Sequence, residues 1–187
     1  SDAFDGSEAD GYSNSPMISP DGRYVAFSSS STNLVPDDTN DEIDVFVHDI
    51  DAGTTSRVSI SSSEVEADGS SYPGGVSSGG QFVSFYSYAS NLVAGDTNET
   101  ADVFVRDILN GTTERVSIAD GVSGDEGNDY SSRPDVSDDG RFVAFESDAS
   151  NLVTGDNNGC RDIFIRDRQN NTTTRVSPDE NGDEADD

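Results

Sequence analysis

One block of sequence occurs three times in this chain, and this repetition constrains the fold more than any other feature. The blocks at 19–60, 77–118 and 137–178 align without a gap, and successive blocks begin 58 and 60 residues apart. Self-similarity at a fixed period is typical of repeat architectures, in which each unit buries its apolar surface by stacking on its neighbours. We therefore expect one array of three similar units.

Each block contains short strands separated by turns. In the first block these are "RYVAFSS", "DVFVHD" and "SRVSI", preceded by a further strand that ends at Ser19. The triplets "VFV", "VFV" and "IFI" are apolar at consecutive positions, which indicates a strand covered on both faces by neighbouring sheets. Gly53, Gly111 and Asn171 occupy the last turn of each block, and these residue types tolerate the positive φ of a hairpin turn.

Four antiparallel strands per unit, stacked radially, describe a β-propeller blade. The predicted fold is therefore all-β, with three four-stranded antiparallel blades. We expect a single β-propeller array over 1–187, with blades at approximately 12–69, 70–127 and 128–187.

The turn that precedes the second predicted strand resembles a known repeat. "SPDGRYVAF" and "SDDGRFVAF" resemble the TolB-like (WD40-like) propeller repeat, which has a Ser-Pro-Asp-Gly turn and an apolar strand ending in Ala-Phe. "SSGGQFVSF" in the second block departs from this pattern, because it lacks the Asp and the Arg. The resemblance implies a propeller but leaves the function open, since such propellers serve as scaffolds, binding platforms and enzyme gates.

Three blades are too few for a closed ring, because propellers have four to eight. "EADG" at Glu8 and "EADD" at Glu184 stand at the same phase of the repeat, so the chain holds three periods cut within the linker. We expect a homo-oligomer or polymer, either two copies forming a six-bladed ring or an open stack.

Each block also carries an acidic loop, "DTNDEID", "DTNETAD" or "DNNGCRD", with Asp, Asn and Asp at positions one, three and seven. This spacing is similar to the DxNxxxD calcium loops of integrin-type propellers, and Ca²⁺ prefers six to eight oxygen ligands. The alternative is an Asx turn, in which the side chain bonds its own backbone. Recurrence before each buried strand favours a structural Ca²⁺ site per blade. The predicted ligands are Asp38, Asn40 and Asp44, then Asp96, Asn98 and Asp102, then Asp156, Asn158 and Asp162.

The net charge of −28 makes cations the expected partners and argues against binding to nucleic acid or anionic membranes. Such a charge fits either a halophilic surface or a secreted calcium-binding protein. No run of 18 apolar residues occurs, so we expect no membrane insertion.

Residues that could suggest catalysis have structural explanations. "GVSSG" at 75–79 fits the G-x-S-x-G pattern of hydrolases, but it aligns with the blade turns of the other units. His48, the single histidine, aligns with Arg106 and Arg166, a substitution that a general base would not be expected to tolerate. Arg57 and its two equivalents are expected to form cross-strand ion pairs with Asp49 and its equivalents.

The sequence therefore predicts a non-enzymatic extracellular module, structural or adhesive, that binds Ca²⁺ and acts by self-assembly or by binding surface proteins or glycans. Asn110 and Asn171 are candidate glycosylation sites. The alternatives are a propeller fragment of a hydrolase and a TolB-like periplasmic interaction platform.

Overall fold

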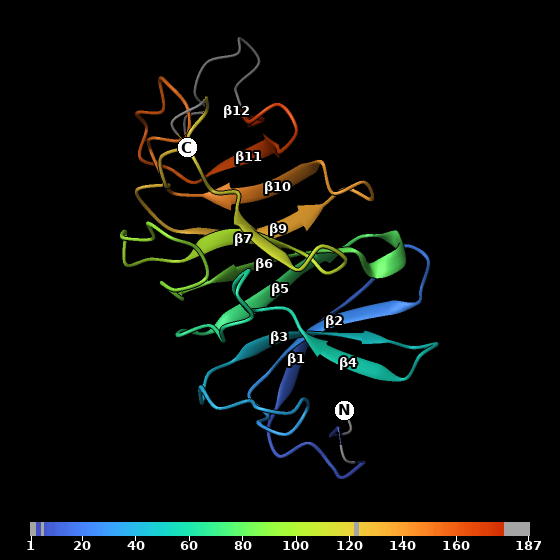
Figure 1. Cartoon of the computed structure of the whole chain (residues 1–187). Helices are drawn as coiled ribbons and strands as arrows, with labels where there is room; N and C mark the ends of the chain where they lie inside the picture. The colour runs from blue at the N-terminus through green and yellow to red at the C-terminus, as the bar shows by residue number, and fades with distance from the viewer. Residues whose placement is uncertain (1–2, 5, 122–123, 178–187) are drawn as a thin grey trace.

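The computed structural model describes residues 3–4, 6–121 and 124–177, and these form three separate four-stranded antiparallel sheets. Figure 1 shows the sheets stacked in sequence order, from blue through green to orange. The chain is thus an all-β array of propeller blades, which confirms the predicted fold class. Its single helix in the described residues is the short 3₁₀ turn η1 (Ser78–Gly80), and no helix there is long and apolar enough to cross a membrane.

Within each sheet the strands follow chain order, so each blade is a simple meander. Blade 1 consists of β1 (Ser13–Ile18), β2 (Tyr24–Ser29), β3 (Asp44–Asp49) and β4 (Thr54–Arg57). Blade 2 consists of β5 (Ser71–Val76), β6 (Phe82–Ser87), β7 (Asp102–Asp107) and β8 (Thr112–Arg115). Blade 3 consists of β9 (Ser131–Val136), β10 (Phe142–Ser147), β11 (Asp162–Asp167) and β12 (Thr172–Arg175).

The tight turn between the last two strands of each blade has the predicted chemistry. Gly53 and Gly111 have φ of 65°, and Asn171 has φ of 56°. Glycine and asparagine adopt this left-handed conformation at little cost, which allows the strand to reverse within a short loop.

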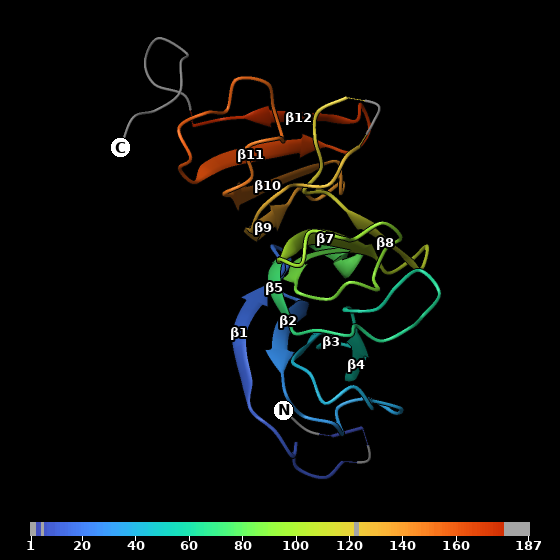
Figure 2. The ribbon, with the colours of Figure 1, turned by 90° about the vertical axis from the view of Figure 1, so that its left-hand side faces the viewer.

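Successive side chains along each strand point alternately to the two faces of the blade. We call the face towards the preceding blade the leading face, and in the third strands it carries Phe46, Phe104 or Phe164. We call the opposite face the trailing face, and in the third strands it carries Val45, Val103 or Ile163. The trailing face of blade 1 and the leading face of blade 2 enclose one apolar cluster, and blades 2 and 3 enclose a second. In Figure 2 the first strands of the blades, β1, β5 and β9, follow one another along one side of the stack, and β5 contacts both of the others.

The third strands of blades 1 and 2 meet the prediction of a strand covered on both faces, and in β3 both Val45 and Phe46 are fully buried. Val103 and Phe104 point to opposite faces of β7 and both are fully buried. In β11 only the leading face is covered, so Phe164 is buried while Ile163 is exposed.

At each internal junction an aromatic ring of one blade meets a glycine of the next. A Cβ atom on Gly80 would lie 2.5 Å from the ring of Tyr24, and one on Gly140 would lie 2.5 Å from the ring of Phe82. Any side chain at these turns would push the blades apart.

We expect Gly80→Ala and Gly140→Ala to destabilise the fold more than Gly53→Ala. All three glycines have similar positive φ, between 65° and 69°, so the backbone strain of about 1–2 kcal/mol is shared. Only the first two add a clash with an aromatic ring, for which overpacking costs about 1–3 kcal/mol more. Urea denaturation measures the free energy of unfolding of each variant, and equal losses at all three positions would contradict the close contact.

Candidate metal centre

The acidic loop of each unit ends at a buried aspartate, the first residue of the blade's third strand. These residues are Asp44, Asp102 and Asp162. A serine that follows the fourth strand donates its hydroxyl hydrogen to each carboxylate and accepts a hydrogen bond from the next backbone N–H of the third strand. The serines are Ser59, Ser117 and Ser177. The position of each carboxylate is therefore fixed from two strands.

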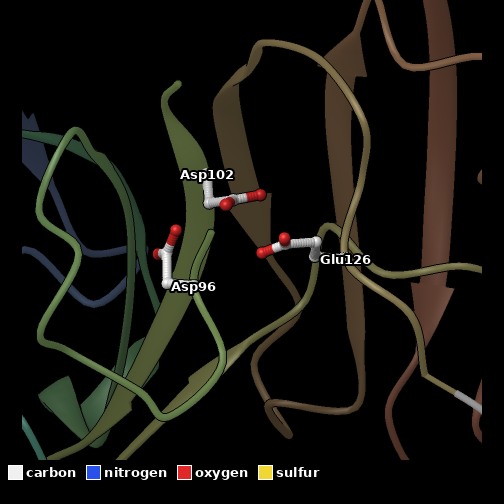
Figure 3. Close-up of side chains that lie close together, drawn as sticks. All are labelled: Asp96, Asp102 and Glu126. Atoms are coloured by element: carbon white, nitrogen blue, oxygen red, sulfur yellow. The ribbon is translucent and has the colours of Figure 1, made fainter. Parts of the chain in front are cut away.

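In blade 2 three carboxylates converge on one point. Single oxygen atoms of Asp96, Asp102 and Glu126 all lie within 4.8 Å of one another. Figure 3 shows Asp96 and Asp102 at the end of the loop and Glu126 reaching towards them from the segment between blades 2 and 3. Two of these residues were predicted from sequence. Glu126 was not among the predicted ligands, although its recurrence as Glu66 one repeat earlier was a usable signal.

An arginine already bonds to all three carboxylates. Nη1 of Arg115 lies 2.7 Å from Glu126, 3.3 Å from Asp102 and 3.5 Å from Asp96. We call this group the carboxylate–arginine cluster of blade 2. Its buried members are held together by charge-assisted hydrogen bonds, which are about twice as strong as neutral ones.

The other blades repeat this arrangement. In blade 1 Nη1 of Arg57 contacts Asp38 at 3.2 Å and Asp44 at 3.3 Å, and it also contacts Glu66. In blade 3 Nη1 of Arg175 lies 3.3 Å from Asp162 and 3.7 Å from Asp156. The residue at the position of Glu66 there is Glu184, which lies outside the described residues.

The predicted cross-strand pairing of Arg57 with Asp49 is wrong. The register places Arg57 opposite Phe46 and Asp49 opposite Thr54, so the two charged residues lie on different parts of the hairpin. Asp49 pairs instead with Arg23 at 2.7 Å. The symmetrical spacing about Gly53 assumed a longer loop than the one that forms, because β4 begins at Thr54, directly opposite Asp49.

The asparagine of each loop has a turn-forming role in this structure. Oδ1 of Asn40, Asn98 and Asn158 accepts a hydrogen bond from the backbone N–H two residues later, which is the Asx turn considered as the alternative. In blade 2 Nδ2 of Asn98 donates to Asp102 at 3.0 Å and to the carbonyl of Gly127 at 2.8 Å. The amide thus turns hydrogens, not oxygen, towards the carboxylates.

Burial changes the acidity of the clustered groups. It raises the pKa of Asp38 and Asp96 to about 6, with repulsion from Asp44 or Asp102 adding to the rise and the arginine opposing it. Burial also raises the pKa of Asp44 and Asp102, against the effect of their serine hydrogen bonds. For Glu126, burial is outweighed by hydrogen bonds from Thr97 and the charge of Arg115, and the pKa is lowered.

The fit to a divalent cation follows from these contacts. The carboxylate oxygens suit Ca²⁺ in type and spacing. The guanidinium of Arg115 and the orientation of Asn98 do not, because both present N–H groups to the same carboxylates. The cluster nevertheless contains three carboxylates and one guanidinium, which leaves two negative charges in excess at pH values where all are ionised.

The other residues singled out by sequence serve the blade turns and the hairpins. Ser77 of "GVSSG" accepts a hydrogen bond from the backbone of Phe82 across the turn, as Ser19 and Ser137 do with their own strands. The ring of His48 bonds to the hydroxyl of Thr55 on the next strand, 3.0 Å away.

Comparisons with known proteins agree on the fold. This chain is similar to TolB from Acinetobacter baumannii, with 17% identity, a TM-score of 0.50, and coverage of 92% of this chain and 33% of that one. It is similar to a putative TolB from Agrobacterium tumefaciens, with 16% identity, a TM-score of 0.51, and coverage of 89% and 62%. It is also similar to the β-propeller domain of the Trilobed protease from Pyrococcus furiosus, with 13% identity, a TM-score of 0.51, and coverage of 88% and 42%.

These likenesses show a TolB-like propeller fold, and at this level of identity they show the fold alone. The chain spans less than two thirds of the length of each of these structures. No protein-family model matches the chain, and neither does any curated protein.

We expect the free energy of unfolding to rise as the pH is lowered from 7 to 5. Asp38 and Asp96 have a folded-state pKa of about 6 against 3.8 for an ordinary aspartate, so the folded state binds protons more readily in this range. Groups whose pKa is lowered, such as Asp49, lose their contribution only below about pH 4. Asp96→Asn should reduce this gain, as measured by urea denaturation at both pH values. The exposed Asp125→Asn is the control, and an equal loss of pH dependence in both variants would contradict the assignment.

Proposed function

We propose that this chain is a non-enzymatic extracellular β-propeller module that acts as a scaffold, through self-assembly or partner binding, and that Ca²⁺ binds at its carboxylate–arginine clusters. The observation that carries the proposal is the excess of carboxylates over guanidinium in the clusters of blades 1 and 2, at buried positions. The propeller fold supports the scaffold role in its general form.

The electrostatic argument starts from the cost of burying charge. Burying an ionised carboxylate away from water costs free energy unless an opposite charge is paired with it. One guanidinium balances only one of the three negative charges in the cluster. The remaining charge can be removed by protonation, which the raised pKa of Asp96 reflects, or by a divalent cation. The overall charge of −28 favours cation binding at every such place.

The proposed ligands are the two aspartates of each loop together with the linker glutamate, where the structure describes it. In blade 2 these are Asp96, Asp102 and Glu126. Asn40, Asn98 and Asn158 could become ligands only by turning their amides, which would break the Asx turn. Ca²⁺ would supply a fixed positive charge that ties the acidic loop, the third strand and the linker together.

The extracellular location follows from the same proposal. Calcium sites of extracellular modules have dissociation constants of about 10⁻⁴–10⁻³ M. A site that shares its carboxylates with an arginine fits this weak range better than the tight binding of an intracellular sensor.

A second candidate is a propeller that belongs to a hydrolase or a TolB-like interaction platform. It is favoured by the likeness in fold to TolB and to the propeller of the Trilobed protease. The two candidates differ in their response to calcium, because neither alternative role requires a cation in the blades.

We expect millimolar Ca²⁺ to raise the melting temperature by more than about ten degrees, whereas NaCl of equal ionic strength should not. Binding to the folded state alone stabilises it by about 2.7 kcal/mol per site at a hundredfold excess over Kd. For a chain of this length each kcal/mol raises the melting temperature by about 2–4 °C. Differential scanning calorimetry measures the shift, and an equal response to both salts would show general screening.

Arg115→Gln tests whether the cation acts at the cluster. This variant leaves three carboxylates without their guanidinium, so we expect it to be less stable than the wild type without calcium and to gain more stability from it. The exposed Arg133→Gln is the matched control, since it removes the same charge away from any cluster. If both variants respond to calcium as the wild type does, the ion does not bind at the cluster.

A further inference from the structure

The trailing face of blade 3 exposes residues whose equivalents are buried in the other blades. Val176 is 50% exposed and Ile163 is 38% exposed. The equivalents of Val176 are Val58 and Val116, and both are fully buried between blades. The equivalents of Ile163 are Val45 and Val103, which are also fully buried. Ala144 is likewise exposed, at the position of the fully buried Ala26 and Ser84. This face therefore has the composition of an internal blade interface, and no sheet formed by residues 3–4, 6–121 and 124–177 covers it.

The leading face of blade 1 shows the same difference from the other side. Val25 and Phe27 are half-buried, while Val83 and Phe85 at the same positions of blade 2 are fully buried. Val25 and Phe27 line an open groove on this face together with Phe4, which is 62% exposed.

Residues before β1 occupy on blade 1 the place that the linkers between blades occupy on blades 2 and 3. Nδ2 of Asn33 donates to the carbonyl of Glu8, as Asn91 does to Glu66 and Asn151 to Glu126. The backbone bond from Ala3 to Ser7 likewise repeats the bond from Ser61 to Val65. Residues before β1 thus lie against blade 1 as the linkers lie against blades 2 and 3, and what the leading face lacks is a sheet.

The glycine–aromatic contact of the internal interfaces has one unpaired member at each end. Gly80 meets the ring of Tyr24 and Gly140 meets the ring of Phe82. A Cβ atom on Gly22, the third equivalent, would meet no other part of the described chain within 4 Å. Phe142, the third aromatic residue, stands at the trailing end of blade 3. The two ends of the array therefore carry complementary halves of the same contact.

We propose that the trailing face of blade 3 of one chain packs on the leading face of blade 1 of a second copy of this chain. The contact would repeat the internal blade interfaces, with Phe142 against Gly22 and with Ile163 and Val176 covered by Val25 and Phe27. It is heterologous, so two chains can close a six-bladed ring through two such contacts. This inference rests on the self-assembly part of the proposed function and names its partner.

A second copy fits this place because no new charge pairing is required. At the junction of blades 2 and 3 Arg168 bonds to Glu114 at 2.9 Å. The equivalent of Arg168 in blade 1 is Ile50, which is 52% exposed, and the equivalent of Glu114 in blade 3 is Thr174. Between two chains an uncharged contact would therefore replace the ion pair. Burial of apolar surface contributes about 25 cal/mol per Å², which makes this exchange favourable for association.

The test is the mass of the chain in solution, measured by analytical ultracentrifugation at micromolar to hundred-micromolar concentration. We expect the wild type to form dimers and Val176→Asp to be monomeric. Val65→Asp is the matched control, because Val65 is 52% exposed on the linker between blades 1 and 2 and receives the same added charge. Circular dichroism shows whether each variant is folded.

The direction of the contact is tested by mixing. Ile50→Asp should disrupt the leading face of blade 1 and, like Val176→Asp, give monomers. In an equimolar mixture each variant retains the face that the other has lost, so we expect heterodimers with one intact contact. A symmetrical contact between like faces would not be restored by mixing.

Three results would overturn the proposal: a monomeric wild type over the whole concentration range, assembly that survives both Val176→Asp and Ile50→Asp, or a mixture that stays monomeric. Assemblies larger than two chains that both variants dissolve support the contact in an open stack. A monomeric wild type would leave these faces to a blade of another chain, and partner binding by the scaffold would stand. The calcium proposal is judged by melting temperature and is independent of these masses.

Discussion

A β-sheet with two apolar faces must be covered on both, and the architecture of this chain follows from that requirement. The third strand of every blade is apolar at consecutive positions, so each blade needs a neighbour on both sides to bury these side chains. Stacking solves the problem for blade 2, whose Val103 and Phe104 are both fully buried. It leaves the trailing face of blade 3 exposed and the leading face of blade 1 only partly covered. The exposed Ile163 and the groove lined by Phe4 are therefore two consequences of one packing rule.

The carboxylate–arginine clusters solve a different problem, which is how to hold long acidic loops against a small core. Arg115 connects the loop through Asp96, the third strand through Asp102 and the linker through Glu126. Such a buried network adds less to net stability than its contacts suggest, because desolvation offsets much of the attraction. The network instead fixes the relative positions of three segments of the chain, because all three meet at the guanidinium of Arg115. The excess negative charge that remains makes the same place a candidate for a divalent ion.

Much of this could be predicted from the sequence because it depends on local pattern. The strand order, the turns at Gly53 and Gly111, and the left-handed Asn171 follow from periodicity and turn chemistry. The convergence of Asp96 and Asp102 follows from their spacing in a tight loop. The guanidinium of Arg115, which lies between them, could not be predicted from local spacing. Arg115 was assigned to Asp107 by counting from the turn, whereas the hairpin register places it opposite Phe104.

The sequence alone determined that the chain is built from three equivalent blades, since the repeat fixes the number, order and strand content of the units. Only the tertiary structure decided which charges meet. Glu126 lies on the segment that joins blades 2 and 3, and it comes close to Asp102 because that linker folds back over the loop, where the N–H of Thr97 donates to it. The tertiary structure also decided how far each face is covered, because the third strands of the three blades share one apolar pattern and the blades differ in which faces have a neighbouring sheet. The apolar pattern of a strand is a local property of the sequence, whereas the burial of a blade face depends on the position of that blade in the stack.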